Sequence, residues 1–250
     1  MLPYFELTTL HLGPIPLQVW GSFVAAGILL GAWISARFAR QQGLNADIVY
    51  SGATWLIIAS FIGARILHVL AYEPGFYAAH PAEALMFWHG GFSIIGGFIG
   101  AAVGYALFVR HARINWIEYA DAFIYGLPLG MACGRLGCFL IHDHPGTVTH
   151  FILGVRYPDG QVRHDHGLYE SLQSLVLAGL FAWFYRRDPK RQPLFFAMIF
   201  LLWYGFVRFV LDFFRLVDVK YFGLTPAQYA CAVMVIGGLF LFSRGQKRTT

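Results

Sequence analysis

The sequence predicts an all-α integral membrane protein with about seven transmembrane helices, and three observations lead to this fold class. Hydrophobic residues make up 58% of the 250 residues and charged residues only 12%, which is about half the charged share of a soluble domain. The mean hydropathy is +0.57. Apolar runs long enough to cross a bilayer as helices recur along the whole chain. We therefore expect most of the chain to lie in lipid.

The expected transmembrane helices follow the apolar runs. We place them at residues 17–36, 49–71, 91–109, 119–141, 168–185, 194–213 and 226–243. Prolines disfavour helix in the lead-in of residues 1–16, and Pro74 and Pro81 indicate a surface segment with a short helical piece between the second and third spans. Residues 1–250 are thus expected to form a single transmembrane domain.

The distribution of lysine and arginine predicts the orientation. The loops after the first, third, fifth and seventh spans hold Arg37, Arg40, Arg110, Arg113, Arg186, Arg187, Lys190, Arg191, Arg244, Lys247 and Arg248, and the opposite loops hold only Arg156, Arg163, Arg215 and Lys220. Positively charged loops stay in the cytoplasm, so the N-terminus is expected outside and the C-terminus inside. The same bias explains the pI of about 9.2 without a nucleic-acid partner.

The three cysteines do not indicate a disulfide framework or a cysteine metal site. Cys133, Cys138 and Cys231 lie in or beside apolar runs, and no Cys-x-x-Cys pair occurs. The N-terminus lacks the basic region of a signal peptide, since its first charged residue is Glu6. The first apolar run is therefore expected to remain as a span.

Arginines within the expected spans are the strongest functional signals. A charge inside an apolar run is costly unless it meets a partner, a polar cavity or a ligand. Asp212 follows Arg208 by four residues and shares its helix face, so the two form either a structural ion pair or part of a pocket for an anionic group such as phosphate. Arg135 has no acidic residue near it in sequence until Asp143. Arg65 lies nearer a helix end, where an arginine can extend to water.

Two His-Asp-His triplets, at residues 142–144 and 164–166, fall in a predicted extracytoplasmic loop over residues 142–167. Residues 151–163 of this loop read as a small hairpin around a Pro-Asp-Gly turn. Imidazole and carboxylate groups suit zinc and other transition metals. The triplets lack an i, i+4 spacing, however, so solvated loop histidines are the favoured interpretation and a metal site is the minority one.

Small residues recur at intervals of four in two spans. The two series are Gly96, Gly100 and Gly104, and Gly126, Gly130 and Gly134. This spacing lets helix backbones approach closely in lipid. Plain helix packing is the expected role of both.

The run Gly134-Arg135-Leu136-Gly137 followed by Phe139 resembles the signature of the prolipoprotein diacylglyceryl transferase family. Further matches follow in the family's order: Gly63-Ala64-Arg65; Gly90-Gly91-Phe92-Ser93 with Gly96-Gly97; Arg163-His164 with Leu168-Tyr169-Glu170; Arg208 with Asp212 to Arg215 and Asp218; and Gly223-Leu224-Thr225 with Gln228. The resemblance covers nearly the whole chain and agrees with seven spans and an outer N-terminus.

The resemblance implies an enzyme of the bacterial cytoplasmic (inner) membrane that takes a diacylglyceryl group from phosphatidylglycerol and joins it to the lipobox cysteine of a prolipoprotein signal peptide. Glycerol phosphate leaves, and no cofactor is implied. It also implies that Arg135 and Arg208 handle the lipid phosphate. We expect substrate binding by Arg135, Arg208, Gly134, Gly137, Gly146, Arg65, Tyr169 and Ser93, and catalysis by His142, Asp143, His144, Glu170 and Asp212.

The chain departs from the family pattern at several positions. They are Ile95 in place of a histidine, Cys138 and Ile141 in place of two asparagines, Asp143 and Asp212 in place of two glutamates, and Trp20 in place of a tyrosine. If the missing histidine serves as a base in the family, another group has to act here. A general base needs a pKa near the working pH and hydrogen-bond reach of the thiol, which makes His142, Asp143 and His144 the candidates.

Two alternatives belong to other classes of function. One is a related membrane transferase with a different donor or acceptor, in which Cys138 is a nucleophile, although a buried inert thiol is the more usual role. The other is a non-enzymatic lipid or metal binder, or a transporter, that uses the two His-Asp-His triplets. Thiol reactivity tests the first and metal content tests the second.

Overall fold

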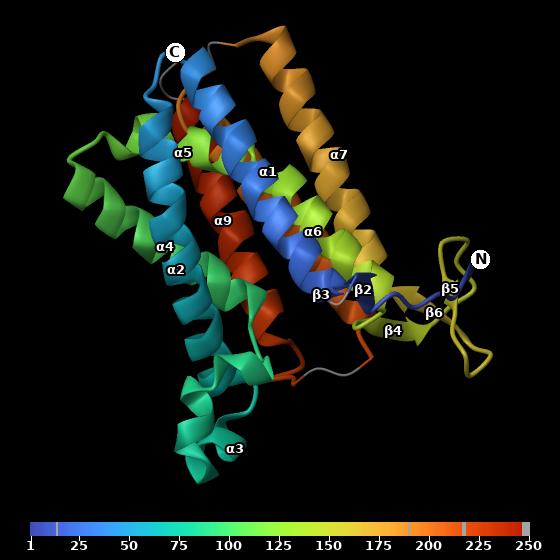
Figure 1. The fold of residues 1–250 in the computed structure, drawn as a ribbon. Coiled ribbons are helices and arrows are strands. Elements are labelled where there is room, and N and C mark those ends of the chain that lie inside the picture. The colour runs from blue at the N-terminus through green and yellow to red at the C-terminus, as the bar shows by residue number, and fades with distance from the viewer. Residues whose placement is uncertain (14, 190, 217–218, 247–250) are drawn as a thin grey trace.

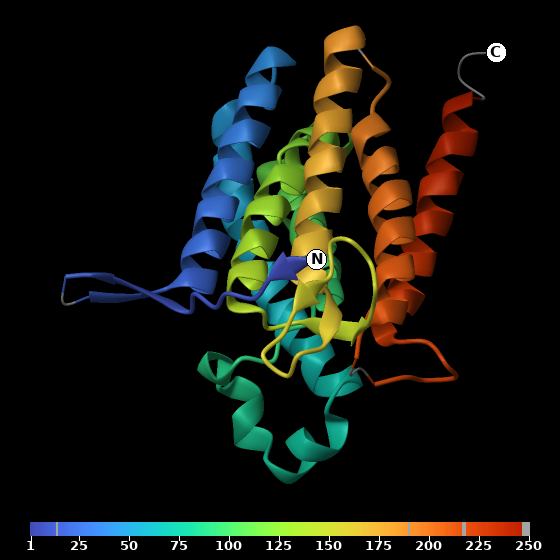
Figure 2. The same cartoon turned by 90° about the vertical axis from the view of Figure 1, so that its right-hand side faces the viewer.

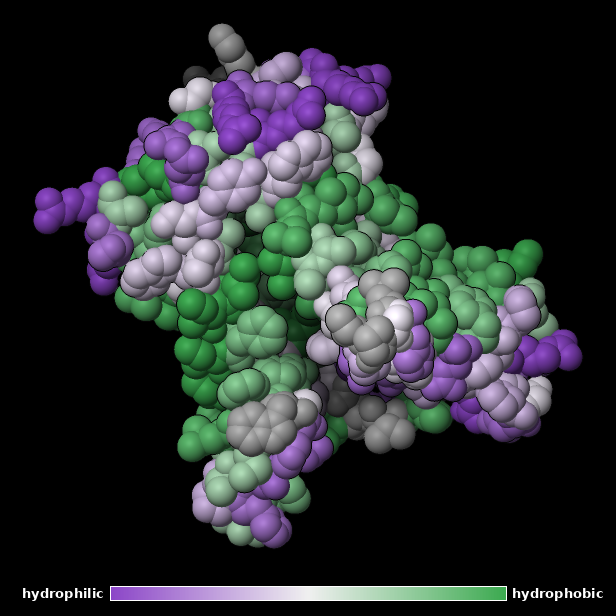
Figure 3. Space-filling model, in the orientation of Figure 1, coloured by the Kyte–Doolittle hydropathy of each residue, from purple (hydrophilic) through white to green (hydrophobic). Residues whose placement is uncertain are grey.

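The computed structural model describes residues 1–13, 15–189, 191–216 and 219–246, and shows a bundle of long helices with a small β-structure at one end (Figures 1 and 2). Lys190, Asp218, Lys247 and Arg248, on which the sequence interpretation drew, lie outside the described residues. Figure 3 shows hydrophobic residues over the middle of one face and hydrophilic residues gathered toward its ends. This surface pattern suits a protein that crosses a membrane.

Eight longer helices form the bundle. They are α1 (Val19–Gln41), α2 (Ala46–Ala71), α4 (Ile94–Ala112), α5 (Trp116–Tyr125), α6 (Leu127–Ile141), α7 (His166–Arg187), α8 (Phe195–Leu211) and α9 (Pro226–Gln246). Asn45, Ser93, Asn115 and Asp165 begin α2, α4, α5 and α7, each accepting a hydrogen bond from a backbone N–H two or three residues on. Pro128 lies in the first turn of α6, so the fourth expected span consists of two helices in line.

Six of the seven expected spans coincide with helices long and apolar enough to cross a membrane. They are Val19–Gln41, Ala46–Ala71, Ile94–Ala112, Trp116–Ile141, Phe195–Phe214 and Pro226–Arg244. The remaining expected span, residues 168–185, corresponds to α7, which is 22 residues long and runs alongside the others (Figure 2). It is less apolar because it buries Glu170, Ser171, Gln173 and Ser174. The all-α membrane fold is confirmed, whereas the count of seven and the orientation stay predictions.

Glycines bring α1 and α6 into backbone contact. A Cβ built on Gly130 would lie 2.6 Å from the carbonyl oxygen of Gly27, and one on Gly31 would lie 3.2 Å from that of Gly126. On the other side of the bundle, Gly63 of α2 meets the backbone of α4 at Gly96 and Gly100. The packing role expected for both glycine series is confirmed at these contacts.

The apolar core and the polar interior occupy opposite ends of the bundle. An aromatic cluster lies where α1 ends and where α6 and α8 begin. Its rings make stacked, tilted and edge-to-face contacts and belong to Phe38, Tyr125, Phe181 and Phe196. Most buried charged groups instead lie toward the ends where α6 and α8 finish and α7 starts. Asp121 of α5 is the exception among the described residues, and it accepts a hydrogen bond from Ala197 N at the start of α8 at 2.9 Å. The apolar end keeps the helices together while the other end is free to carry polar groups.

A four-stranded sheet lies beside the polar end of the bundle. Its order is β1 (Leu2–Pro3), β5 (Val155–Arg156), β6 (Val162–Asp165) and β4 (Pro145–Val148), and a separate hairpin joins β2 (Thr9–Leu12) to β3 (Ile15–Gln18). The predicted hairpin is confirmed as β5 and β6, with a shorter first strand than expected. The strands in the N-terminal lead-in were missed. β1 pairs with a segment about 150 residues away, whereas β2 and β3 form a local hairpin that the sequence interpretation did not recognise.

The segment between α2 and α4 is irregular and contains only short helical pieces, as predicted from its prolines. It contains α3 (Pro74–Ala79) and two 3₁₀ turns, η1 (Pro81–Leu85) and η2 (Phe87–His89). A further 3₁₀ turn, η3 (Asp212–Phe214), follows α8 directly and lies at the polar end of the bundle.

Replacing Gly130 with alanine is expected to destabilise the bundle. The new Cβ would stand 2.6 Å from the Gly27 carbonyl oxygen, which forces α1 and α6 apart. The measurement is the thermal unfolding midpoint of the full chain in detergent. Gly179→Ala in α7 is the matched control, because nothing lies within 4 Å of its new Cβ and alanine favours helix by about 1 kcal/mol. Equal midpoints for the two variants would contradict the close approach.

Candidate active site

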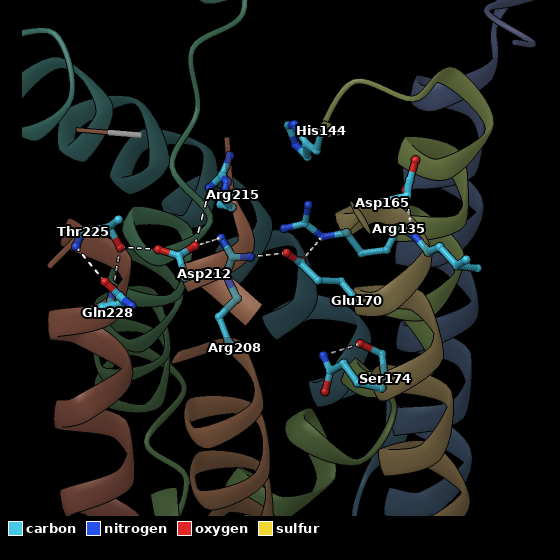
Figure 4. A network of polar contacts seen from close by, with 12 residues as sticks. Arg135, His144, Asp165, Glu170, Ser174, Arg208, Asp212, Arg215, Thr225 and Gln228 are labelled. Carbon is cyan, nitrogen blue, oxygen red and sulfur yellow. Dashed lines mark hydrogen bonds and ion pairs between the residues drawn. The ribbon is translucent and has the colours of Figure 1, made fainter. Parts of the chain in front are cut away.

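A chain of ion pairs crosses the polar end of the bundle (Figure 4). The Glu170 carboxylate of α7 forms an ion pair with Arg135 of α6, whose Nε lies 2.8 Å from Oε2, and accepts a hydrogen bond from Arg208 Nη1 of α8. Arg208 Nη2 lies 3.0 Å from Asp212 Oδ1, at the start of η3. Glu170, Arg208 and Asp212 are each at most 3% exposed. The charges of three helices are therefore satisfied by one another inside the protein.

The i, i+4 pair of Arg208 and Asp212 confirms the shared helix face predicted from sequence. Glu170 lies one turn into α7, and the cap at Asp165 fixes where that turn begins. Its position between two arginines was missed, because the sequence does not reveal how α7 is placed against α6 and α8. The Tyr204 hydroxyl is also fully buried on α8, and among the described residues it has no hydrogen-bond partner. No signal in the sequence singled it out.

Asp212 is held from the other side by the start of α9. The Thr225 hydroxyl donates to Asp212 Oδ2, and Gln228 Oε1 accepts from the Thr225 backbone N–H at 3.0 Å. Arg215 Nη1 lies 3.8 Å from Asp212 Oδ1. Thr225 and Gln228 are each 1% exposed. These contacts explain why the threonine and glutamine of the family-like run before α9 belong to the same site.

Gly146 of β4 helps to place Arg215. The two residues form an isolated antiparallel bridge, and a Cβ at Gly146 would stand 2.7 Å from the Phe214 carbonyl oxygen. A side chain at this position would push the loop after η3 away from the sheet. The glycine therefore has a structural role through backbone fit, and its part in substrate binding stays a prediction.

Three arginines gather around two carboxylates in this cluster. Within the described part of the chain, Arg135, Arg208 and Arg215 share the two carboxylates of Glu170 and Asp212. The side chain of Arg135 is 13% exposed and that of Arg215 is 23% exposed, whereas Arg208 is closed off. Figure 4 shows Arg135 between Glu170 and the side on which His144 and Arg215 lie. The arrangement suits an anionic group that enters from the sheet end and meets a guanidinium fork.

The chain turns back over α6 just after the helix ends. His142 takes the left-handed conformation with φ of 50°, and this places Asp143 and His144 beside Cys138. One side-chain atom from each of the three lies within 4.8 Å of the other two. Burial, and then the charges of Arg135 and Arg215, lower the pKa of His144 to about 4. Burial raises the pKa of Asp143 to about 6, against the opposing effect of Arg135.

His142 itself joins the two His-Asp-His triplets. Its Nδ1 lies 2.7 Å from Asp165 Oδ2, with both side chains 1% exposed, and Asp165 also accepts from the Tyr157 hydroxyl at 3.1 Å. The imidazole stacks on Tyr4 at 4.6 Å and meets the edge of Phe5. This enclosure favours a structural role in fastening α6 to the sheet and to α7. The predicted catalytic role of His142 stays a prediction.

Arg65 uses all its donors on one loop. Its Nε donates to Ala84 O at 3.1 Å, Nη1 donates to the carbonyls of Gly90 and Gly91, and Nη2 donates to those of Glu83 and Met86. A guanidinium has five N–H groups, so its predicted contact with substrate stays a prediction that this geometry does not favour. Arg65 instead lines a separate polar cavity of about 360 Å³ with His68 and Glu73.

The remaining predicted residues have local structural contacts. Ser93 caps α4 by accepting from Gly96 N at 3.3 Å, and the Tyr169 hydroxyl lies 2.9 Å from His164 Nδ1. Gly137 packs against Phe23, with its Cβ position 2.7 Å from that of Phe23, and Gly134 packs more loosely against Val24. Their predicted roles in substrate binding are untested by these contacts.

The fold and site together define the class of protein: a multi-pass α-helical membrane protein with a buried arginine–carboxylate cluster that is partly exposed at one end. The family model for prolipoprotein diacylglyceryl transferase matches residues 8–244. The chain belongs to this family, as the sequence resemblance predicted.

Curated relatives are similar over most of their length. The phosphatidylglycerol–prolipoprotein diacylglyceryl transferase of Nitrosomonas europaea is 30% identical over 96% of this chain and 89% of its own. Proteins of the same name from Staphylococcus carnosus and Bordetella avium are 34% and 31% identical. These matches cover 84% and 99% of this chain, and 79% and 97% of the relatives.

Substituting Glu170 with glutamine is expected to weaken the fold. The two arginines would lose their shared carboxylate, and breaking a buried ion pair typically costs about 3–5 kcal/mol. The thermal midpoint in detergent should fall clearly for Glu170→Gln and much less for Glu170→Asp. Asp159→Asn provides the control, since it removes an exposed pair with Arg163 and such pairs contribute little. If Glu170→Gln and Asp159→Asn melt alike, the buried network does not hold the helices together.

Proposed function

We propose that this protein transfers the diacylglyceryl group of phosphatidylglycerol to the lipobox cysteine of prolipoproteins in the bacterial cytoplasmic membrane. Family membership and the names of the relatives support this activity. The observation that carries the proposal is the buried cluster of Arg135, Arg208 and Glu170, since a guanidinium beside an open end is suited to a lipid phosphate. The sheet end of the bundle is the predicted outer side, where a secreted acceptor arrives.

The arginines would act mainly on the leaving group. The acceptor sulfur attacks the glyceryl carbon next to the phosphate, a C–S bond forms, and the C–O bond to phosphate breaks with its electron pair leaving on oxygen. The released glycerol phosphate therefore carries one more negative charge than the phosphodiester did. Guanidinium groups aimed at this charge, in an interior that excludes water, stabilise the transition state more than the ground state.

The acceptor thiol must lose its proton before or during the attack. Ile95 is 2% exposed and packs in an apolar cluster with Ala227 and Cys231, so no base is present at the position where the family has a histidine. Asp143 and His144 lie on the more exposed side of Arg135, with side chains 31% and 34% exposed. We therefore propose that the thiol is bound and deprotonated beside these two residues.

A related transferase with another acceptor remains the second candidate, because Cys138 is a thiol at the site itself. Its 5% exposure supports an inert or ligand-bound sulfur more than a free nucleophile. Labelling the folded protein with a thiol reagent separates the two. Stoichiometric reaction at Cys138, together with a covalent lipid intermediate on it, would favour the alternative.

Complementation is the direct test of the proposed function. In cells depleted of their own diacylglyceryl transferase, this chain should restore lipidation of a lipobox protein, measured by gel shift. Arg135→Gln and Arg208→Gln should lower transfer by about 10²–10³-fold, the usual effect of removing one charge-stabilising donor. Arg135→Lys should recover only part of it, because a lysine keeps the charge but lacks the fork.

Arg163→Gln is the matched control, since this arginine pairs with the exposed Asp159 away from the cluster. It should transfer lipid at the normal rate. Full activity in Arg135→Gln, with membrane insertion shown for every variant, would overturn the proposed role of the cluster.

A further inference from the structure

Cys138, Asp143 and His144 form a mixed set of metal-binding groups. The set contains a sulfur, a carboxylate oxygen and an imidazole nitrogen, all within 4.8 Å of one another. Zinc binds these three kinds of ligand, and catalytic zinc sites have three protein ligands and an open fourth position. The sequence interpretation placed a minority metal site on the His-Asp-His triplets. The structure directs His142 away to Asp165 and brings Cys138 in instead.

The hydrogen bonding of His144 leaves the correct nitrogen free to bind a cation. Its Nδ1 lies 2.8 Å from the Asp143 carbonyl oxygen, to which only an N–H can donate. Nε2 therefore carries the lone pair and faces Asp143 Oδ2 at 3.7 Å. This separation is long for a hydrogen bond but close to the roughly 3.4 Å between two ligands of a tetrahedral zinc with bonds near 2.1 Å. A ring N–H held by a backbone carbonyl is the usual support of a metal-bound histidine.

The charges around the group favour an ion with two anionic ligands. Arg135 and Arg215 lie close enough to affect His144 and would repel a bare dication. A thiolate and a carboxylate neutralise a divalent ion completely, however, and the imidazole adds no charge. Binding would therefore leave the ion pair of Arg135 with Glu170 unchanged.

We propose that Cys138, Asp143 and His144 bind one divalent ion of the zinc class, with a fourth position open toward water. The partial exposure of Asp143 and His144 gives the ion a route of entry and leaves room for one more ligand. The search for a Cys-x-x-Cys pair did not indicate this site, because the residues near Cys138 are an aspartate and a histidine that follow the end of α6. The family resemblance implies no cofactor, but the family pattern has an asparagine where this chain has Cys138.

The fourth position suits the acceptor sulfur, an assignment that rests on the proposed function. The acceptor thiol replaces a bound water, and its proton passes to solvent. A metal-bound thiol is deprotonated at neutral pH, so the sulfur attacks the glyceryl carbon as a thiolate. The C–O bond breaks, its electron pair leaves on the phosphate oxygen beside Arg135, and the thioether product is a weaker ligand that can dissociate. No oxidant or reductant is required.

Metal analysis of the full chain, purified in detergent without chelator, tests the site itself. After incubation with zinc and desalting, one zinc per chain is expected. Cys138→Ser, Asp143→Asn and His144→Ala should each lower zinc affinity by about 100-fold or more, at least as much as the loss of an outer-shell partner. Cys133→Ser and His150→Ala are the matched controls, because neither side chain belongs to the group, and both should keep the metal. His144→Ala is informative even if Cys138→Ser folds poorly, since His144 is partly exposed.

Cobalt substitution tests the fourth position. The cobalt-loaded protein should show a thiolate-to-cobalt absorption band that disappears in Cys138→Ser. A lipobox peptide should intensify the band, and the same peptide with serine in place of its cysteine should not. No response to the cysteine peptide would overturn the assignment of the fourth position to the acceptor.

The outcomes separate the metal site from the proposed function. Lipid transfer that is lost with a chelator and restored by zinc supports both. Full transfer by protein shown to contain no metal overturns the assignment of the fourth position to the acceptor sulfur and leaves the proposed function standing. Stoichiometric zinc that depends on Cys138 and His144, without lipid transfer to any lipobox substrate, overturns the proposed function and leaves the metal site standing.

Discussion

The carboxylate of Glu170 between Arg135 and Arg208 is the interaction on which the polar end of this protein depends. Charges in a membrane interior are tolerated only when they are paired or hydrogen-bonded, and here each guanidinium meets the same carboxylate from a different helix. The continuation through Asp212 to Thr225 then draws the start of α9 into the network. Four helices are therefore fixed by charges that also form the site. The same residues therefore serve both the fold and the site, and conservative changes such as Glu170→Asp are the most informative ones.

The rest of the fold makes this arrangement possible. At the far end, aromatic residues such as Phe38, Phe181 and Phe196 provide an apolar core, and glycines bring the backbone of α1 against α6 and that of α2 against α4. These contacts hold the helices together independently of the arginine–carboxylate cluster. The small sheet closes the other end and, through the bridge of Gly146 to Arg215, brings a third guanidinium to the edge of the cluster.

The departures from the family pattern fall into two physical groups. Ile95 is absorbed into apolar packing with Ala227 and Cys231, so its position has no proton chemistry in this chain. Cys138 and Trp20 instead lie in contact at the open side of Arg135, next to two residues with metal-binding side chains. The departures thus leave an apolar residue at one position and place a thiol beside a carboxylate and an imidazole at another. This is the reason for treating the altered positions as a rearranged site.

The sequence by itself determined the membrane class, most of the helices, the close-packed glycines and the two arginines, because each of these depends on local composition or on spacing along one helix. The Arg208–Asp212 pair was predictable for the same reason. Only the tertiary structure decided that Glu170 bridges both arginines, that Arg65 is used by backbone carbonyls, and that His142 turns toward Asp165 while Asp143 and His144 turn toward Cys138. Those contacts depend on the register of α7 against its neighbours and on one left-handed residue at the end of α6, and neither is encoded in a periodic pattern.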